Sequence, residues 1–243
     1  MKKIIIAILC IFAMIGAMTS VNSIKDKINK NNISTTYDDV SLKKLTLSSL
    51  GDSLTAGHGN KDNWVYYINQ QEQFKYVSNY GIGGSTIAIV DEDNINSHTP
   101  LVTRYTQMPH SDIISVMCGV NDRDLNVPLG DENSTDLTTF YGALDLLVRG
   151  LVSRYNTSYI FFMTPLPTTW DTNKLGLNLD DYCNAIKNVC ERYDVDVLDT
   201  HNEMKFDFDT DTTDGEHLTS KAYKEIMAPF IANYLKANYD KIK

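Results

Sequence analysis

Short apolar runs alternate with longer amphipathic stretches along most of the chain, and this alternation constrains the fold more than any other feature. A run of a few apolar residues is typical of a strand, whereas apolar residues that recur every three or four positions are typical of a helix. We expect strands at residues 45–50, 74–77, 112–118, 159–164 and 195–198, and helices at 64–71, 135–155, 179–193 and 220–239.

Strands that are separated by helices favour a parallel sheet with helices on both faces. The run at 112–118 is almost continuously apolar, which is expected of a strand that is buried on both sides. The pattern therefore predicts an α/β fold. It leaves the strand order open, although the flavodoxin-like order 2-1-3-4-5 is common and needs only five strands.

The boundaries of some elements are less sharply marked. Ser134 and Asp136 are both candidates for the N-cap of the helix at 135–155, because their side chains can accept a bond from the first helical turn. Residues 85–110 are expected to be partly helical, with breaks at two prolines, and residues 201–216 to form an irregular acidic loop.

Length and charge limit the classes of function. The chain has 243 residues, which fits a single α/β domain. Its formal net charge of -9 argues against a nucleic-acid partner, which would require a basic face. It also argues against electrostatic attachment to anionic lipid.

The first residues predict export. Two lysines precede an uncharged apolar run at 4–17, which is short for a membrane span of about 20 residues and typical of a signal peptide. We expect a signal peptide at 1–23, cleaved after Ser23 or near Ala17, a flexible polar spacer at 24–43, and a domain at 44–243. The mature protein would be secreted or held at the cell surface without stable membrane association; an uncleaved anchor is the alternative.

Cysteines and acidic residues give no metal site. Removal of the signal peptide leaves Cys118, Cys183 and Cys190, an odd number without zinc spacing, which we interpret as free thiols. The acidic run 207–211 resembles a calcium loop, but Thr212 stands where such a loop needs glycine. The sequence therefore contains no metal-binding motif of these kinds.

A serine follows the first expected strand on a short turn. Ser53 lies in the run Gly-Asp-Ser-Leu at 51–54, at the carboxyl edge of the sheet, where ligands bind in open α/β folds. A serine on such a turn can expose its Oγ to a substrate. The turn is not the elbow of the common α/β-hydrolases, because Thr55 stands where that elbow has its second glycine.

Two further loops would lie at the same edge of the sheet. The loop 79–85 contains three glycines, which permit tight turns and leave N–H groups accessible, but it has the spacing of neither a dinucleotide nor a P-loop motif. The loop 119–122 contains Asn121, whose amide can donate a hydrogen bond to a developing oxyanion.

A fourth loop, 213–219, precedes the last expected helix. It places Asp214 three residues before His217. In a tight turn this spacing allows the carboxylate to bond Nδ1 of the imidazole, so that Nε2 faces the serine. The remaining histidines, at 58, 98, 110 and 201, have no acid at a suitable spacing and are expected to be surface or structural residues.

These four loops together resemble the SGNH, or GDSL, hydrolase superfamily over about residues 45–236. Its markers are a serine, a glycine, an asparagine and a histidine in separate blocks. Ser53 matches the nucleophile, and Gly84, five residues after Asn79, matches the glycine better than its neighbour Gly83 does. The last two markers are matched by Asn121 and by His217, which Asp214 precedes.

The resemblance implies a flavodoxin-like three-layer α/β/α sandwich with a five-stranded parallel sheet. It also implies ester hydrolysis by a Ser53–His217–Asp214 triad. The oxyanion would be held by the N–H groups of Ser53 and Gly84 and by the amide of Asn121. No cofactor is required.

The resemblance leaves several substrates and activities open. A secreted serine esterase for short acyl esters, including acetyl groups on a small molecule or a carbohydrate, is our leading interpretation. A lipase, an acyltransferase with the same site and a catalytically silent carbohydrate-binding module are the alternatives. The polar loops at 122–134 and 201–216 do not suggest the apolar lid of a lipase, and Trp170 either lines the substrate cleft or packs on its own loop.

Overall fold

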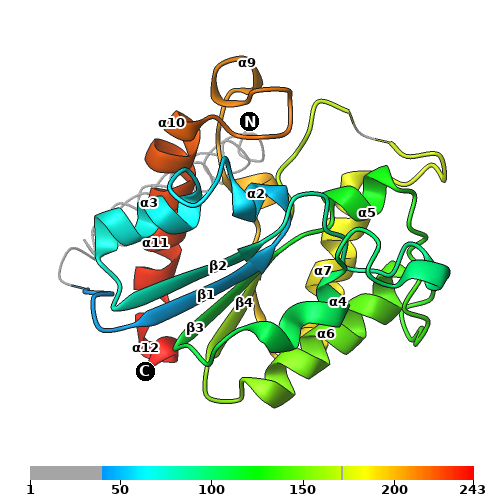
Figure 1. Cartoon of the computed structure of the whole chain (residues 1–243), viewed down its shortest axis with the longest axis horizontal. Helices are drawn as coiled ribbons and strands as arrows, with labels where there is room; N and C mark the ends of the chain where they lie inside the picture. Colours follow the sequence, from blue (N-terminus) through cyan, green and yellow to red (C-terminus); the bar gives the residue numbers. More distant parts are fainter. Residues whose placement is uncertain (1–39, 171) are drawn as a thin grey trace, which may run out of the picture. The chain divides into compact units, whose positions relative to one another are not determined.

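Five parallel strands form one sheet in the order β2-β1-β3-β4-β5 (Figure 1). This confirms the α/β fold and the flavodoxin-like strand order that the resemblance implied. The strands are β1 (Thr46–Gly51), β2 (Tyr76–Gly81), β3 (Ile113–Met117), β4 (Tyr159–Met163) and β5 (Asp196–Leu198).

The computed structural model describes residues 40–170 and 172–243. The expected signal peptide at 1–23 lies outside the described residues, as does the expected spacer up to residue 39. Of the spacer's last four residues, Leu42 is buried in the core. Val40–Lys243 forms one compact unit.

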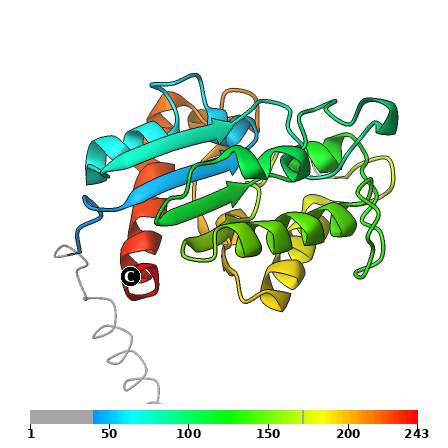
Figure 2. The ribbon, with the colours of Figure 1, turned by 60° about the horizontal axis from the view of Figure 1, so that its bottom comes forward.

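Helices cover both faces of the sheet (Figures 1 and 2). Alternate residues of a strand point to opposite faces, so in β3 Ile114 and Val116 join one core cluster while Ile113 and Met117 join the other. The first cluster contains the apolar sides of α6 (Phe140–Arg154) and α7 (Leu179–Arg192). The second contains those of α3 (Trp64–Glu72) and α11 (Ala228–Ala237).

Shorter elements connect these layers. Four lie near the carboxyl ends of the strands: α2 (Ser53–Ala56), α5 (Val120–Asp124), α8 (Thr200–Glu203) and α9 (Phe208–Asp211). The others are the 3-10 turns Glu92–Asn94 and Tyr105–Gln107 and the helices α4 (Leu101–Arg104), α10 (Ser220–Ala222) and α12 (Tyr239–Ile242). In the described part of the chain, no helix has the length and apolarity needed to cross a membrane.

Two expected boundaries were wrong for physical reasons. The second strand runs over 76–81 rather than 74–77, because backbone pairing with β1 continues to Gly81 through polar residues of this half-exposed edge strand. The helix expected from 135 begins at Phe140. Its N-cap is Thr139, whose hydroxyl accepts from Gly142 N–H at 3.3 Å, while Asp136 accepts from Thr138 N–H at 2.9 Å and so holds a separate turn.

The C-terminal segments also differ in detail from the expectation. The continuous helix expected at 220–239 is interrupted by a π-helical turn at Tyr223–Met227 and continues as α11. The loop expected at 201–216 contains α9 and most of α8.

Candidate active site

The turn after β1 carries Ser53 to the edge of the sheet. Gly51, the last residue of β1, pairs with Gly81 of β2 and with Met117 of β3. Asp52 then caps α2, since its Oδ1 accepts from Leu54 N–H at 3.0 Å. Ser53 is the first residue of that short helix, so its own N–H has no acceptor within the helix.

The structure brings Ser53, His217 and Asp214 together. His217 Nε2 lies 2.9 Å from Ser53 Oγ, and Nδ1 lies 2.7 Å from Asp214 Oδ2. The other carboxylate oxygen of Asp214 accepts from the N–H groups of Glu216 at 3.0 Å and His217 at 2.8 Å. The carboxylate thus fixes both the backbone of the turn and the orientation of the ring.

The charge of Asp214 is stabilised by the same bonds. Partial burial alone would raise the pKa of this carboxyl, but the hydrogen bonds from His217 and from Glu216 N–H hold the pKa below its ordinary value. An ionised carboxylate on Nδ1 selects the ring tautomer whose Nε2 can accept a proton.

The glycine loop lies beside the serine. Ser85 N–H donates to Ile82 O at 3.2 Å, and Gly84 has φ +76°, as the third position of a type II turn requires. A Cβ on Gly83 would lie 3.9 Å from Ser53 Cβ. Among the described residues no acceptor receives the Gly84 N–H, so this group is free to bond a ligand.

Asn121 lies in the short helix α5 after β3, and its side chain reaches the glycine loop. Its Nδ2 donates to Ser85 O at 2.9 Å, next to Gly84 in the chain. An amide nitrogen carries two hydrogens, so one remains for another acceptor. Cys118 Sγ lies 3.1 Å from the same carbonyl, and this contact fixes the glycine loop against the end of β3.

The guanidinium of Arg104 connects the glycine loop to the ends of β1 and β2. The residue is only 6% exposed. Its Nη2 donates to Gly51 O at 2.7 Å and to Ser85 Oγ at 2.9 Å. Nη1 donates to Tyr80 O at 2.6 Å, and Nε to Thr99 O at 3.1 Å. The ends of β1 and β2 and the glycine loop are therefore tied to one side chain.

Buried carboxyls surround this arrangement. Burial raises the pKa of Asp52 to about 7, and Asp52 Oδ2 has no hydrogen-bond partner among the described residues. Burial also raises the pKa of Asp122 to about 7, against the opposing effect of backbone N–H bonds from Ala88 and Ile87. Glu216, only 5% exposed, places Oε1 3.6 Å from His217 Nε2, and burial raises its pKa as well.

The sequence analysis did not single out four buried residues near the site: Arg104, Asp52, Asp122 and Glu216. Asp52 and Asp122 directly adjoin Ser53 and Asn121, and the available signal was a charged residue next to a candidate site residue. Arg104 gave no such signal, since three of its four hydrogen-bond acceptors lie 19 to 53 residues away in the sequence.

The other histidines were predicted to be surface or structural residues, and the ring nitrogens of two of them make polar contacts. His58 Nε2 lies 2.8 Å from Leu218 O. His201 Nε2 lies 3.2 Å from the carboxylate oxygen Oδ1 of Asp180. That acid is 21 positions earlier in the chain, so the contact is a long-range one that local spacing cannot show.

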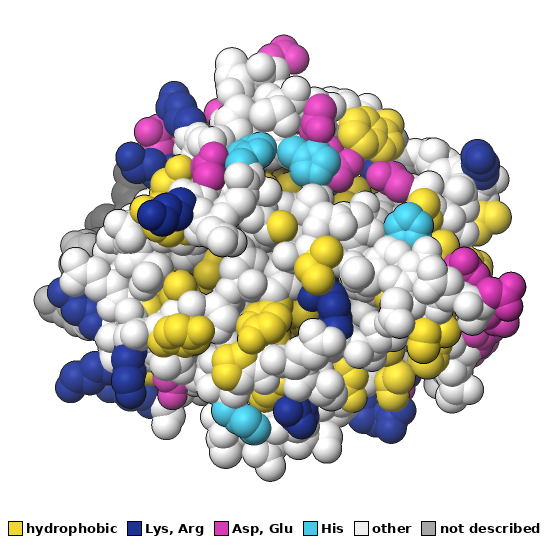
Figure 3. Space-filling model, viewed as in Figure 1, with side chains coloured by type: hydrophobic (Ala, Val, Ile, Leu, Met, Phe, Trp, Pro, Cys, Tyr) yellow, Lys and Arg dark blue, Asp and Glu magenta, His cyan; other side chains and the backbone are white. Residues whose placement is uncertain are grey.

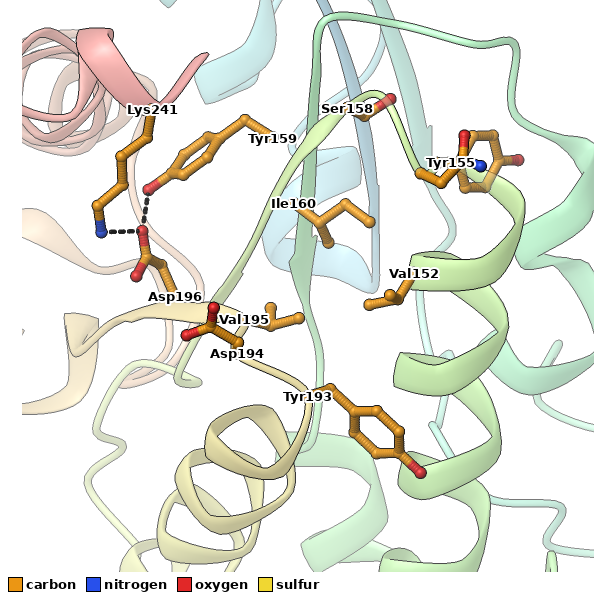
Figure 4. Close-up of a pocket in the computed structure, with 11 residues that line it drawn as sticks. Val152, Tyr155, Ser158, Tyr159, Ile160, Tyr193, Asp194, Val195, Asp196 and Lys241 are labelled. Carbon is orange, nitrogen blue, oxygen red and sulfur yellow. Dashed lines mark hydrogen bonds and ion pairs between the residues drawn. The ribbon is translucent and has the colours of Figure 1, made fainter. Parts of the chain in front are cut away.

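A hollow of about 340 Å³ lies away from this edge (Figure 4). It is lined by the starts of β4 and β5, where Tyr159 Oη and Lys241 Nζ contact Asp196 Oδ2 at 2.7 and 2.6 Å. It is therefore remote from Ser53. In the described residues no cluster of histidine, cysteine or acidic side chains could hold a metal ion.

Comparisons with known proteins point to one family. The model of the GDSL-like Lipase/Acylhydrolase family matches residues 49–225. A protein from Lactobacillus plantarum of solved structure is 28% identical; the match covers 82% of this chain and 98% of that chain with a TM-score of 0.72. An aryl esterase of M. smegmatis, 17% identical over 79% of this chain and 98% of its own, shares the fold with a TM-score of 0.59. No curated protein matches the sequence.

Proposed function

Because the chain belongs to the GDSL-like Lipase/Acylhydrolase family, whose members act on acyl esters, we propose that it is a secreted serine esterase that hydrolyses short-chain acyl esters, acetyl esters included. The hydrogen-bonded series from Ser53 Oγ through His217 to Asp214 carries this proposal. A nucleophile, a base and an orienting acid in this order form the arrangement that performs acyl transfer through serine in many hydrolases.

Each residue has a defined part in the proposed reaction. His217 Nε2 takes the proton of Ser53 Oγ as that oxygen attacks the ester carbonyl. The N–H groups of Ser53 and Gly84 and the free amide hydrogen of Asn121 stabilise the negative oxygen, and one such donor contributes about 3 kcal/mol. His217 then gives the proton to the leaving alcohol, and water attacks the acyl-enzyme in the same way.

The reaction needs neither a metal nor an organic cofactor. Asp214 orients the ring and stabilises the imidazolium without becoming protonated. Gly84 is the proposed donor in preference to Gly83 because it matches the family's glycine marker; the N–H groups of both glycines have no backbone acceptor among the described residues.

The polar character of the surroundings supports a short acyl group. On the face of the molecule shown in Figure 3, histidine and acidic side chains lie close to hydrophobic ones. A long acyl chain would need a continuous apolar groove. Export by the segment 1–23 would place the enzyme outside the cell or at its surface.

The test compares the wild type with Ser53→Ala, both expressed as residues 24–243, on p-nitrophenyl acetate and p-nitrophenyl octanoate. Loss of the nucleophile is expected to lower kcat by about 10⁴-fold or more, and acetate is expected to be the better substrate. Ser41→Ala changes an exposed serine ahead of β1 and is the matched control, with activity close to that of the wild type.

Three results would support other activities. A preference for the octanoate would favour a lipase, and acetyl transfer to an added sugar would favour an acyltransferase. A wild type that hydrolyses neither ester and resists a fluorophosphonate would contradict the esterase proposal and favour a silent carbohydrate-binding module.

A further inference from the structure

An exposed indole lies on a loop that is hydrogen-bonded to the turn carrying His217. Trp170, in the loop after β4, is 42% exposed. Thr169 N–H donates to Gly215 O at 3.1 Å. The loop that carries the indole is therefore joined to the turn that carries His217.

The indole is also held in a fixed orientation, which is unusual for an exposed side chain. Its Nε1 donates to Asp124 Oδ1 at 3.3 Å. The guanidinium of Arg123 lies 5.8 Å from the ring centroid, and its Nη1 donates to Trp170 O at 2.7 Å. Arg123 is 1% exposed, so the support beneath the ring is rigid. A ring fixed in this way binds a flat apolar surface without further loss of side-chain entropy.

The groups around the indole are polar and of both signs. Asp124 and Arg123 are close enough to Glu216 to act on its charge, and Glu216 Oε1 is 3.6 Å from His217 Nε2. A hollow of about 290 Å³ adjoins the ring, and its lining includes Arg123, Asp124, Asn126, Trp170, Asn173 and Lys174.

The charged and polar groups around the indole discriminate between possible alcohol components of the ester substrate. A lipid alcohol would find one aromatic ring among charged and amide groups, which cannot bury a chain. A cationic alcohol would face the guanidinium next to the ring, and an anionic one would face the carboxyls of Asp124 and Glu216. Hydroxyl groups both donate and accept, and they can therefore bond the carboxyls, the amides and the cations alike.

We propose that Trp170, with Asp124 and Glu216 beside it, forms the subsite for the alcohol half of the ester, and that this half is an uncharged sugar ring stacked on the indole. The inference rests on the proposed function, since it requires Ser53 to attack an ester. It adds the class of alcohol and the residues that select it.

The experiment measures acetate release from an acetylated methyl glucoside, ethyl acetate, hexyl acetate and acetylcholine. The wild type is expected to have its highest kcat/KM on the glucoside. Trp170→Ala is expected to lower the ratio of kcat/KM for the glucoside to that for ethyl acetate by roughly tenfold, mainly through KM. Trp170→Phe keeps an aromatic face, and the ratio should stay within about threefold of the wild type.

Tyr76→Ala is the matched control, because Tyr76 is 57% exposed on the edge strand β2 and should leave the ratio unchanged. The proposal is overturned by an unchanged ratio in Trp170→Ala, by an equal loss in Trp170→Phe, or by a wild-type preference for hexyl acetate or acetylcholine. Hydrolysis of ethyl acetate without the glucoside would refute the subsite alone. Acetate release from none of the four esters would refute the esterase proposal itself.

Discussion

Replacing Arg104 by methionine tests whether one buried cation holds the loops of the site together. Methionine has a similar unbranched stem but no N–H donor. The change removes hydrogen bonds to the carbonyls of Gly51, Tyr80 and Thr99 and to Ser85 Oγ. Gly51 lies two residues before Ser53, and Ser85 directly follows Gly84, so the bonds to these two residues act on the nucleophile and on a proposed oxyanion donor together.

The size of the effect follows from the number and kind of these bonds. A hydrogen bond from a charged donor contributes about 1.5–3 kcal/mol, but four bonds of one group do not add, and water can reach some of the acceptors. We therefore expect the free energy of unfolding to fall by about 3–5 kcal/mol, less than the sum of four such bonds. An oxyanion donor that is displaced rather than lost should lower kcat by about 10- to 100-fold.

The assay combines urea unfolding with the kinetics of p-nitrophenyl acetate hydrolysis. Arg104→Lys keeps the charge but not the fork of donors, so its stability and kcat should lie between those of the wild type and Arg104→Met. Arg154→Met is the matched control. Arg154 is exposed and donates to its neighbour Tyr155, so the loss should stay within about 0.5 kcal/mol. If Arg104→Met kept the stability and kcat of the wild type, the reasoning would be refuted.

Two carboxyls give further predictions. Asp214→Asn should lower kcat by about 10²- to 10⁴-fold, since the amide no longer selects the ring tautomer or stabilises the imidazolium; full activity in this variant would disprove the role of Asp214. The raised pKa of Asp52, about 7, means that the folded protein keeps a proton which the unfolded chain releases near pH 4. The stability that Asp52 contributes is thus fully present below about pH 4 and is lost as the pH rises through 7. Asp52→Asn should reduce the difference in the free energy of unfolding between about pH 5 and pH 8, measured by urea unfolding, and an unchanged difference would contradict this assignment.

The sequence predicted the apolar strands better than the polar edge strand β2. β3 and β4 are buried on both faces, so their apolar runs mark them within one or two residues. β2 is an edge strand whose polar residues are held by backbone pairing, which leaves no trace in an apolar pattern. The start of α6 was misplaced for a similar reason: Asp136 is a good cap by residue type, but its carboxylate bonds Thr138 in a turn of its own.

In the site, too, residues in local sequence patterns were predictable and residues with long-range contacts were not. Ser53, Asn121 and the Asp214–His217 pair each belong to a short local pattern, so they could be named from the sequence, and the structure brings them to one edge of the sheet. Asp214 and His217 interact across one turn, which spacing can reveal. The bonds of Arg104 join segments that are distant in sequence, and no periodicity or spacing of a single sequence reports such contacts.

The arrangement of these contacts makes the site one cooperative unit. In the central loops, the residue next to a proposed reacting group forms hydrogen bonds with a different segment. Ser85, which follows Gly84, accepts from Arg104 through its hydroxyl and from Asn121 through its carbonyl. Asp122, next to Asn121, accepts from the N–H groups of Ile87 and Ala88. Displacing one loop therefore moves a donor that belongs to another. Substitutions of Asp122 and Arg104 should consequently be non-additive, because both act on the position of the same glycine loop and share the loss of its alignment with Ser53.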